Sequence, residues 1–388
     1  MTRFIQLHAL TVYAPSNLNR DDTGRPKTAR FGGAERLRIS SQALKRAIRT
    51  SPKFIERLHG HRGERTQRFG EEIRLYLEKK EGIGAEVAKE TARRIAEVFG
   101  KVKDPKAVDK QGRDVSTYIE QLAFVSGEEK ALAFELADKV ANGEKLPEKP
   151  SDLIAAVLCK TGTAADIAMF GRMLADNPEY NREAAVQVAH AITTHRVEVE
   201  DDFYTAVDDL KKSSEDAGAG FIGELGFGSG VFYLYACIDR DQLVRNLGGD
   251  EGLASSAIAA FTEGFASVSP SGKQNSFAAH SRASYLRVEK GDQQPRSLAA
   301  AFFKPVRDDR DYDLLGESIK RLRGDEESGN GGETPTGAKP KEPKNPGLIE
   351  EMNQAYGDCF DDHLEMRCIP GRAVHGSLKD LIVFAAAA

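Results

Sequence analysis

The segment Phe227 to Ile238, FGSGVFYLYACI, limits the fold more than any other part of the chain. It is apolar on both faces, and a strand of that kind lies in the interior of a sheet. Phe4 to Tyr13 alternates between two faces, which predicts a strand that ends at Ala14-Pro15-Ser16-Asn17. Ala283 to Val288 predicts another strand. The chain therefore folds around a sheet built from distant segments.

Residues 54–180 have a helical pattern instead. Glu, Lys, Arg and Ala dominate, and apolar residues recur at helical spacing, as in Ile95, Val98 and Phe99. We interpret this stretch as a helical insertion. Helices are also predicted near Ser297 to Phe303 and in the tail from Leu378 to Ala388. Residues 324–347 contain essentially no large apolar side chain, which predicts a mobile loop.

Composition indicates a globular, cytoplasmic protein. Apolar residues make up 40% and charged residues 30% of the chain. No run approaches the roughly 20 apolar residues that a membrane span needs, and the start lacks the apolar core of a secretory signal. The four cysteines form no CxxC pair, which fits a reducing compartment. Cys359, His363, Cys368 and His375 lack the usual spacing of zinc ligands, so we expect no metal site.

The net charge of -5 conceals an asymmetry between the first 50 residues and the rest. Residues 1–50 hold ten Lys and Arg against three Asp and Glu, a net charge of +7, and the remainder holds 45 against 57, a net charge of -12. This distribution indicates a local site for a polyanion on an otherwise acidic protein.

A capped basic helix lies within that positive segment. Two serines precede Gln42 to Arg49, and Pro52 closes the segment. Because helix N-termini attract phosphate, Gln42, Lys45 and Arg49 can grip successive phosphates together with cations of the preceding loop, Pro15 to about Gly33. The same pattern also fits an ordinary solvated helix face. The local charge and the adjacent Gly32-Gly33 favour ligand contact.

Two adjacent aromatic residues, Phe203 and Tyr204, lie between acidic flanks. On a protruding hairpin they can wedge against nucleic-acid bases, whereas in a core they simply pack, and the sequence leaves both open.

Signatures of enzymes are weak. His190 and His195 are five residues apart, and the glycines from Gly223 to Gly230 precede a strand instead of opening a helix. No GxSxG is present. Two alternatives to RNA binding remain: a metal-dependent nuclease that uses Asp21 or Asp22, and an assembly protein whose basic face docks an acidic protein.

Several motifs together resemble the CasC backbone subunit of the type I-E CRISPR Cascade complex. They are SNLNRDD (Ser16 to Asp22), FGGAERLRISSQALKRAIR (Phe31 to Arg49), FGRM (Phe170 to Met173), HAITTH with the following AVDDL, and FGSGVFY. They lie in order within about the first 240 residues. The last third of the chain shows only diffuse resemblance, at features such as Gly272-Lys273-Gln274.

The resemblance implies an α+β fold shaped like a hand. Its palm is a modified RRM-like, ferredoxin-like domain with a helical fingers insertion and a thumb hairpin. The implied parts are palm at 1–54, fingers at 55–180, palm at 181–195, thumb at 196–226, and palm again at 227–388 with the loop 324–347.

The resemblance also implies a non-catalytic role without cofactor or metal. The chain would polymerise along one CRISPR RNA with further copies of itself, presenting guide bases for pairing with target DNA in antiviral defence. Expected partners are the large, small, cap and RNA-processing subunits of Cascade and a recruited helicase-nuclease, with no membrane. The implied RNA contacts are Asn19, Arg20, Lys27, Ser40, Gln42, Lys45 and Arg49 in the palm, Arg172 and Met173 beside a displaced nucleotide, and Phe203 and Tyr204 in the thumb.

Overall fold

The computed structural model describes residues 2–206, 221–307, 313–324, 347–356, 360, 362–371 and 373–387. The chain divides into two compact units. The first, here the sheet unit, comprises Met1–Phe54, Val188–Ile238 and Ile258–Ala388, and the second, here the helical unit, comprises Ile55–Gln187 and Asp239–Ala257. The predicted fingers range, 55–180, falls in the helical unit, which also takes the segment after β9.

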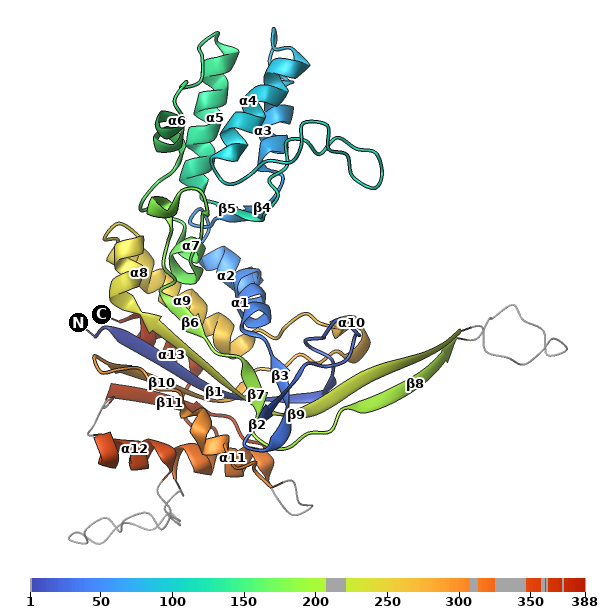
Figure 1. Ribbon diagram of the computed structural model, residues 1–388. Coiled ribbons are helices and arrows are strands. Elements are labelled where there is room, and N and C mark those ends of the chain that lie inside the picture. The colour runs from blue at the N-terminus through green and yellow to red at the C-terminus, as the bar shows by residue number, and fades with distance from the viewer. Residues whose placement is uncertain are drawn as a thin grey trace, which may run out of the picture. The chain divides into compact units, whose positions relative to one another are not determined.

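A largely antiparallel sheet forms the sheet unit, with strand order β11-β10-β1-β9-β7-β3-β2 (Figure 1). Strand β9 lies between β1 and β7, so the prediction of an interior strand is confirmed. β6 and β8 also pair with β9. The strands are β1 (Phe4–Ser16), β2 (Thr28–Phe31), β3 (Ala34–Ile39), β6 (Val186–Val188), β7 (Ala191–Thr193), β8 (Glu200–Ala206), β9 (Phe221–Asp239), β10 (Ala283–Gly291) and β11 (Asp362–Arg367).

Helices around this sheet supply its hydrophobic core. α11 (Leu314–Arg323) and α12 (Leu348–Tyr356) pack with the short helix η2 (Leu298–Phe302) against buried side chains of β1, β9 and β10. α11 buries Leu315, Ile319 and Leu322, which lie on one face at helical spacing. The remaining helices that lie wholly or mainly in this unit are α1 (Ser41–Arg49), α9 (Glu251–Ser267), α10 (Gln274–Phe277) and α13 (Leu378–Ala386).

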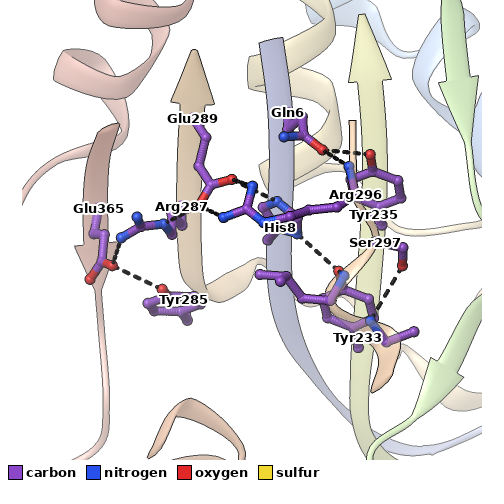
Figure 2. A network of polar contacts seen from close by, with 12 residues as sticks. Gln6, His8, Tyr233, Tyr235, Tyr285, Arg287, Glu289, Arg296, Ser297 and Glu365 are labelled. Carbon is purple, nitrogen blue, oxygen red and sulfur yellow. Dashed lines mark hydrogen bonds and ion pairs between the residues drawn. The ribbon is translucent and has the colours of Figure 1, made fainter. Parts of the chain in front are cut away.

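A buried polar network links β1, β10 and β11 (Figure 2). Glu289 is fully buried and accepts from Arg287 at 2.7 Å and from Arg296 at 2.8 Å, and His8 Nε2 lies 3.4 Å from the same carboxylate. Arg287 also donates to Glu365 on β11. Because a buried charge without partners costs several kcal/mol, at about 3–5 kcal/mol for a broken pair, this network favours one strand register.

The helical unit is built around its own apolar core. Phe69, Ile73, Ala92 and Ile95 belong to that core together with Leu153. Its elements are α3 (Phe69–Leu77), α4 (Ala85–Glu97), α5 (Gly127–Ala141), α6 (Pro150–Val157), α7 (Ala165–Phe170), α8 (Arg240–Asn246), the small sheet of β4 (Glu64–Thr66) and β5 (Ala123–Val125), and η1 (Pro178–Tyr180), while α2 (Pro52–Arg57) spans the boundary between the units.

Two segments differ from the sequence prediction. The loop predicted from Pro15 to about Gly33 contains β2, because Thr28 to Phe31 pairs with β3 across a turn at Gly32 and Gly33, both with positive φ. The segment around His363, where the sequence predicts no strand, contains β11, and the carboxylate of Glu365 on this strand joins the buried network. No helix within the described ranges is long and apolar enough to cross a membrane.

Candidate nucleic-acid interface

Helix α1 forms where the sequence predicts a capped basic helix. The side chain of Ser40 accepts from Ala43 N at 3.3 Å, while Leu44 and Ile48 are buried. The first turn has no acidic residue, and Arg46 and Arg49 lie in the last turn. Ser40 was predicted to meet RNA; here its hydroxyl caps the helix and the residue is 6% exposed. The positive helix N-terminus is thus set in place by Ser40.

The loop before β2 is closed on itself. Asp21 Oδ1 accepts from the main-chain N–H groups of Thr23 and Arg25, at 2.9 and 3.0 Å. Hydrogen bonds from Thr23, foremost from its side chain, lower the pKa of Asp21. Lys27 N donates to Asn19 O at 2.8 Å, and Asn19 Oδ1 accepts from Ser40 N at 2.8 Å. Asn19 therefore ties this loop to the cap of α1.

A groove of about 470 Å³ lies between this loop and α1. The exposed guanidinium groups of Arg20 and Arg46 bring positive charge to its lining, and Asp21 is its acidic lining residue. It is lined by Leu18 to Asp21, by Ala43, Arg46, Ala47 and Thr50, and by Ser269 to Gly272. A polar groove of this size with two arginines suits a nucleotide phosphate.

The other predicted residues of α1 lie on a neighbouring face of the helix. Gln42 is exposed, Lys45 and Arg49 are half-buried, and burial lowers the pKa of Lys45. The residues at i, i+3, i+4 and i+7 that line the groove start at Ala43, one position after Gln42. The sequence prediction thus missed Arg46, which stands in the same basic run but on the groove side.

Positive charge also gathers at the start of α1. His190 Nδ1 lies 3.1 Å from the guanidinium of Arg38 and 3.4 Å from Ser41 N. Burial, followed by the charges of Arg38 and Lys27, lowers the pKa of His190. Lys27 is therefore close enough to contribute to the same positive field.

The segment that completes the groove has an unusual backbone. Lys273 and Ala278, at the two ends of α10, have φ values of 51° and 50° although neither is glycine. Gly272 lies so close to Leu18 that a Cβ there would stand 2.1 Å from the Leu18 carbonyl oxygen. The side chain of Lys273 is exposed beside the groove residues Ser271 and Gly272. Sequence reasoning gave Lys273 no role, because a strained φ leaves no sequence signal at a lysine.

The two aromatic residues lie on an antiparallel ribbon formed by β8 and β9 (Figure 1). Phe203 is 62% exposed and Tyr204 45% exposed. They pair with Glu224 and Gly223, and neighbouring residues on a strand point to opposite faces. The rings are therefore exposed, one on each face of the ribbon, and do not pack into a core; the base wedge stays a prediction. Part of the predicted thumb, residues 207–220, lies outside the described residues.

In the helical unit, Arg172 and Met173 have different surroundings. The side chain of Arg172 is 2% exposed, donates to Glu129 at 2.5 Å, and reaches the carbonyl oxygens of Phe124 and Tyr180. Met173 is 78% exposed. The RNA contact predicted for Arg172 stays a prediction; in this structure its guanidinium is enclosed and fixes the backbone that presents Met173.

Within the described ranges, no group of three or more His, Cys, Asp or Glu side chains is placed to hold a metal ion. Cys359, a member of the zinc site considered from the sequence, lies outside those ranges. His195 is buried, and its Nε2 accepts from Val231 N at 3.2 Å.

The chain matches the family of CT1975-like proteins over residues 5–332. Curated proteins give no match. Among solved structures, a chain of a "CRISPR RNA-guided surveillance complex, pre-nicking" is similar with 30% identity and a TM-score of 0.77, covering 98% of this chain and 100% of that one. A chain of a "CRISPR RNA-guided surveillance complex" follows with 25% identity and a TM-score of 0.67, covering 99% and 100%. The protein belongs to the CT1975-like family, designated Cas_CT1975.

Proposed function

We propose that this protein is a non-catalytic backbone subunit of a type I-E CRISPR surveillance complex, which binds guide RNA and polymerises along it. The observation that carries the proposal is the arginine-lined groove beside the capped helix α1. It lies in a chain that aligns over 98% of its length with a subunit chain of an RNA-guided complex. Both groove arginines, Arg20 and Arg46, belong to the first 50 residues, which carry a net charge of +7.

The groove and its surroundings would bind the RNA backbone. Arg20 and Arg46 would contact phosphate in the groove, and Lys27 would add to the field at the start of α1. The same RNA strand would also contact four further residues: Asn19, Gln42, Lys45 and Arg49. Such contacts carry no sequence information, so specificity comes from pairing between guide and target DNA.

The exposed rings would act on bases instead of phosphates. Phe203 and Tyr204 directly follow the acidic residues Glu200, Asp201 and Asp202 on β8, and the carboxylates of Glu200 and Asp202 repel phosphate. A ring that faces an RNA strand there would stack on or displace a base. Met173 would do the same from the helical unit.

A non-catalytic role fits the state of Asp21. Its Oδ1 accepts from the main-chain N–H groups of Thr23 and Arg25 and from the Thr23 hydroxyl, so it is engaged in the turn. Target cleavage would belong to a recruited helicase-nuclease, and the large, small, cap and RNA-processing subunits would complete the particle.

Purification with the proteins encoded beside it, at moderate salt, tests the proposal. We expect a large particle with several copies of this chain and a discrete RNA that RNase removes. An RNA-free particle would favour the assembly protein that docks an acidic partner. A monomer that cuts nucleic acid with added divalent metal, and loses cleavage in Asp22→Ala, would favour the nuclease.

A further inference from the structure

The loop that carries Asn19, Arg20 and Lys27 is fastened to the base of the β8–β9 ribbon. Asn17 is fully buried, and its Nδ2 donates to Gly24 O in the loop at 2.9 Å and to Gly226 O on β9 at 2.8 Å. Both hydrogens of this amide are thereby used, one on each side. The Asn17 side chain is a cross-link between loop and ribbon.

An ion pair fastens the same two elements. Arg25 Nη1 lies 2.9 Å from Asp201 Oδ1, and Nη2 donates to Oδ2 at 3.2 Å, a two-pronged contact with both side chains about half exposed. Pro26 packs beside Gly226, where an added Cβ would stand 3.1 Å from Pro26 Cδ. We call these contacts of Asn17, Arg25 and Pro26 with Asp201 and Gly226 the joint.

The joint continues into the groove. The loop is closed by the bond from Lys27 N to Asn19 O, and Asn19 Oδ1 holds Ser40 N at the cap of α1. An unbroken series of hydrogen bonds therefore connects the helix that lines the groove with the base of the ribbon. Displacing one of these elements strains the next.

We propose that Asn17 and the Arg25–Asp201 pair are positioning residues that hold the ribbon in one direction relative to the groove. This inference rests on the proposed function, because its purpose is to align Phe203 or Tyr204 with an RNA strand in the groove. A two-stranded ribbon has little stability of its own, so its direction depends on what fastens its base. Ordering a loose ribbon upon binding would cost affinity, which the joint prevents.

The chain contains no Trp, so Thr205→Trp places a single fluorescent reporter on the ribbon. In this background we would compare Asn17→Ala, Arg25→Ala, Asp201→Ala and the charge swap Arg25→Asp with Asp201→Arg. Arg196→Ala is the matched control, because it removes an exposed arginine paired with Glu198 outside the joint. Time-resolved anisotropy of the reporter measures ribbon motion without RNA, and titration with labelled single-stranded RNA measures affinity.

We expect the three alanine variants of the joint to increase the amplitude of nanosecond motion and to weaken RNA binding about three- to ten-fold. The charge swap should restore both properties toward the parent values. Arg196→Ala should change neither the ribbon motion nor the RNA affinity. If Asn17→Ala does not fold, the half-exposed Arg25 and Asp201 variants decide. Unchanged ribbon motion in those variants, or a charge swap that restores neither property, overturns the proposal that the joint holds the ribbon. A parent protein that binds no RNA while its variants loosen the ribbon overturns the proposed function instead.

Discussion

At the scale of single residues, Lys273 combines a strained backbone with an exposed charge beside the groove. Glycine adopts its φ without strain, so Lys273→Gly should raise the free energy of unfolding by about 1 kcal/mol while weakening RNA binding. Lys273→Ala should weaken binding equally without the gain in stability. Ala278→Gly, at the other end of α10, relieves the same strain without losing charge, and it should stabilise the protein and leave RNA affinity unchanged. Urea unfolding measures the stability of the three variants, and RNA titration measures their affinity. Equal affinity of Lys273→Ala and the parent would show that Lys273 does not contact RNA.

Glu289 gives the sheet unit a dependence on pH. Burial by itself raises the pKa of Glu289, but the bond with His8 and the charges of Arg287 and Arg296 outweigh it and lower this pKa well below its usual range. A depressed folded-state pKa means that the stabilisation is complete above the unfolded value of about 4.3 and is lost as pH falls below it. Glu289→Gln should therefore cost about 3–5 kcal/mol at pH 7, since it leaves buried arginines underpaired. The difference in free energy of unfolding between Glu289→Gln and the parent, measured with urea, should shrink between pH 5 and pH 3. A constant difference would exclude this linkage.

At the scale of elements, the two faces of α1 make separable predictions. Lys45→Glu with Arg49→Glu should weaken RNA binding for all sequences and flatten its salt dependence, because each lost phosphate contact removes about one counterion from the slope. Arg20→Glu with Arg46→Glu should also weaken RNA binding and flatten its salt dependence, because both arginines line the groove. Lys379→Glu on α13 reverses an exposed cation remote in sequence, with half the change in net charge, and should leave the slope unchanged. An unchanged slope in either double variant removes that face from the interface.

The sequence predicts most elements but not all their partners. The interior strand β9 and the capped helix α1 follow from apolar pattern and from Ser40, which are local signals. The sequence does not predict β2 and β11. Both are short and polar, and they form because they pair with β3 and β10 respectively. The site divides in the same way. Basic residues are visible in the sequence, whereas burial of Arg172 by Glu129 depends on a tertiary contact.

At the scale of the whole molecule, charge and exposed aromatic rings argue for assembly on a polyanion. Residues 1–50 carry a net charge of +7 and the rest of the chain carries -12, so the positive charge is confined to one segment of each copy. Under the proposed function, RNA would bind the positive segment of each copy and hold several copies on one strand. The number of bound copies should then rise stepwise with RNA length.

Mass photometry of the purified chain with single-stranded RNAs of increasing length measures this stoichiometry. We expect equal increments of length to add one copy each, at low salt more completely than at high salt, since screening weakens the phosphate contacts. Phe203→Ala with Tyr204→Ala should keep the first copy bound but lower the occupancy of longer RNAs, because under the proposed function the exposed rings would contact the RNA beside the next copy. A single copy on every RNA length would mean that the chain binds RNA without forming a filament, and equal occupancy of the aromatic variant would take the ribbon out of assembly.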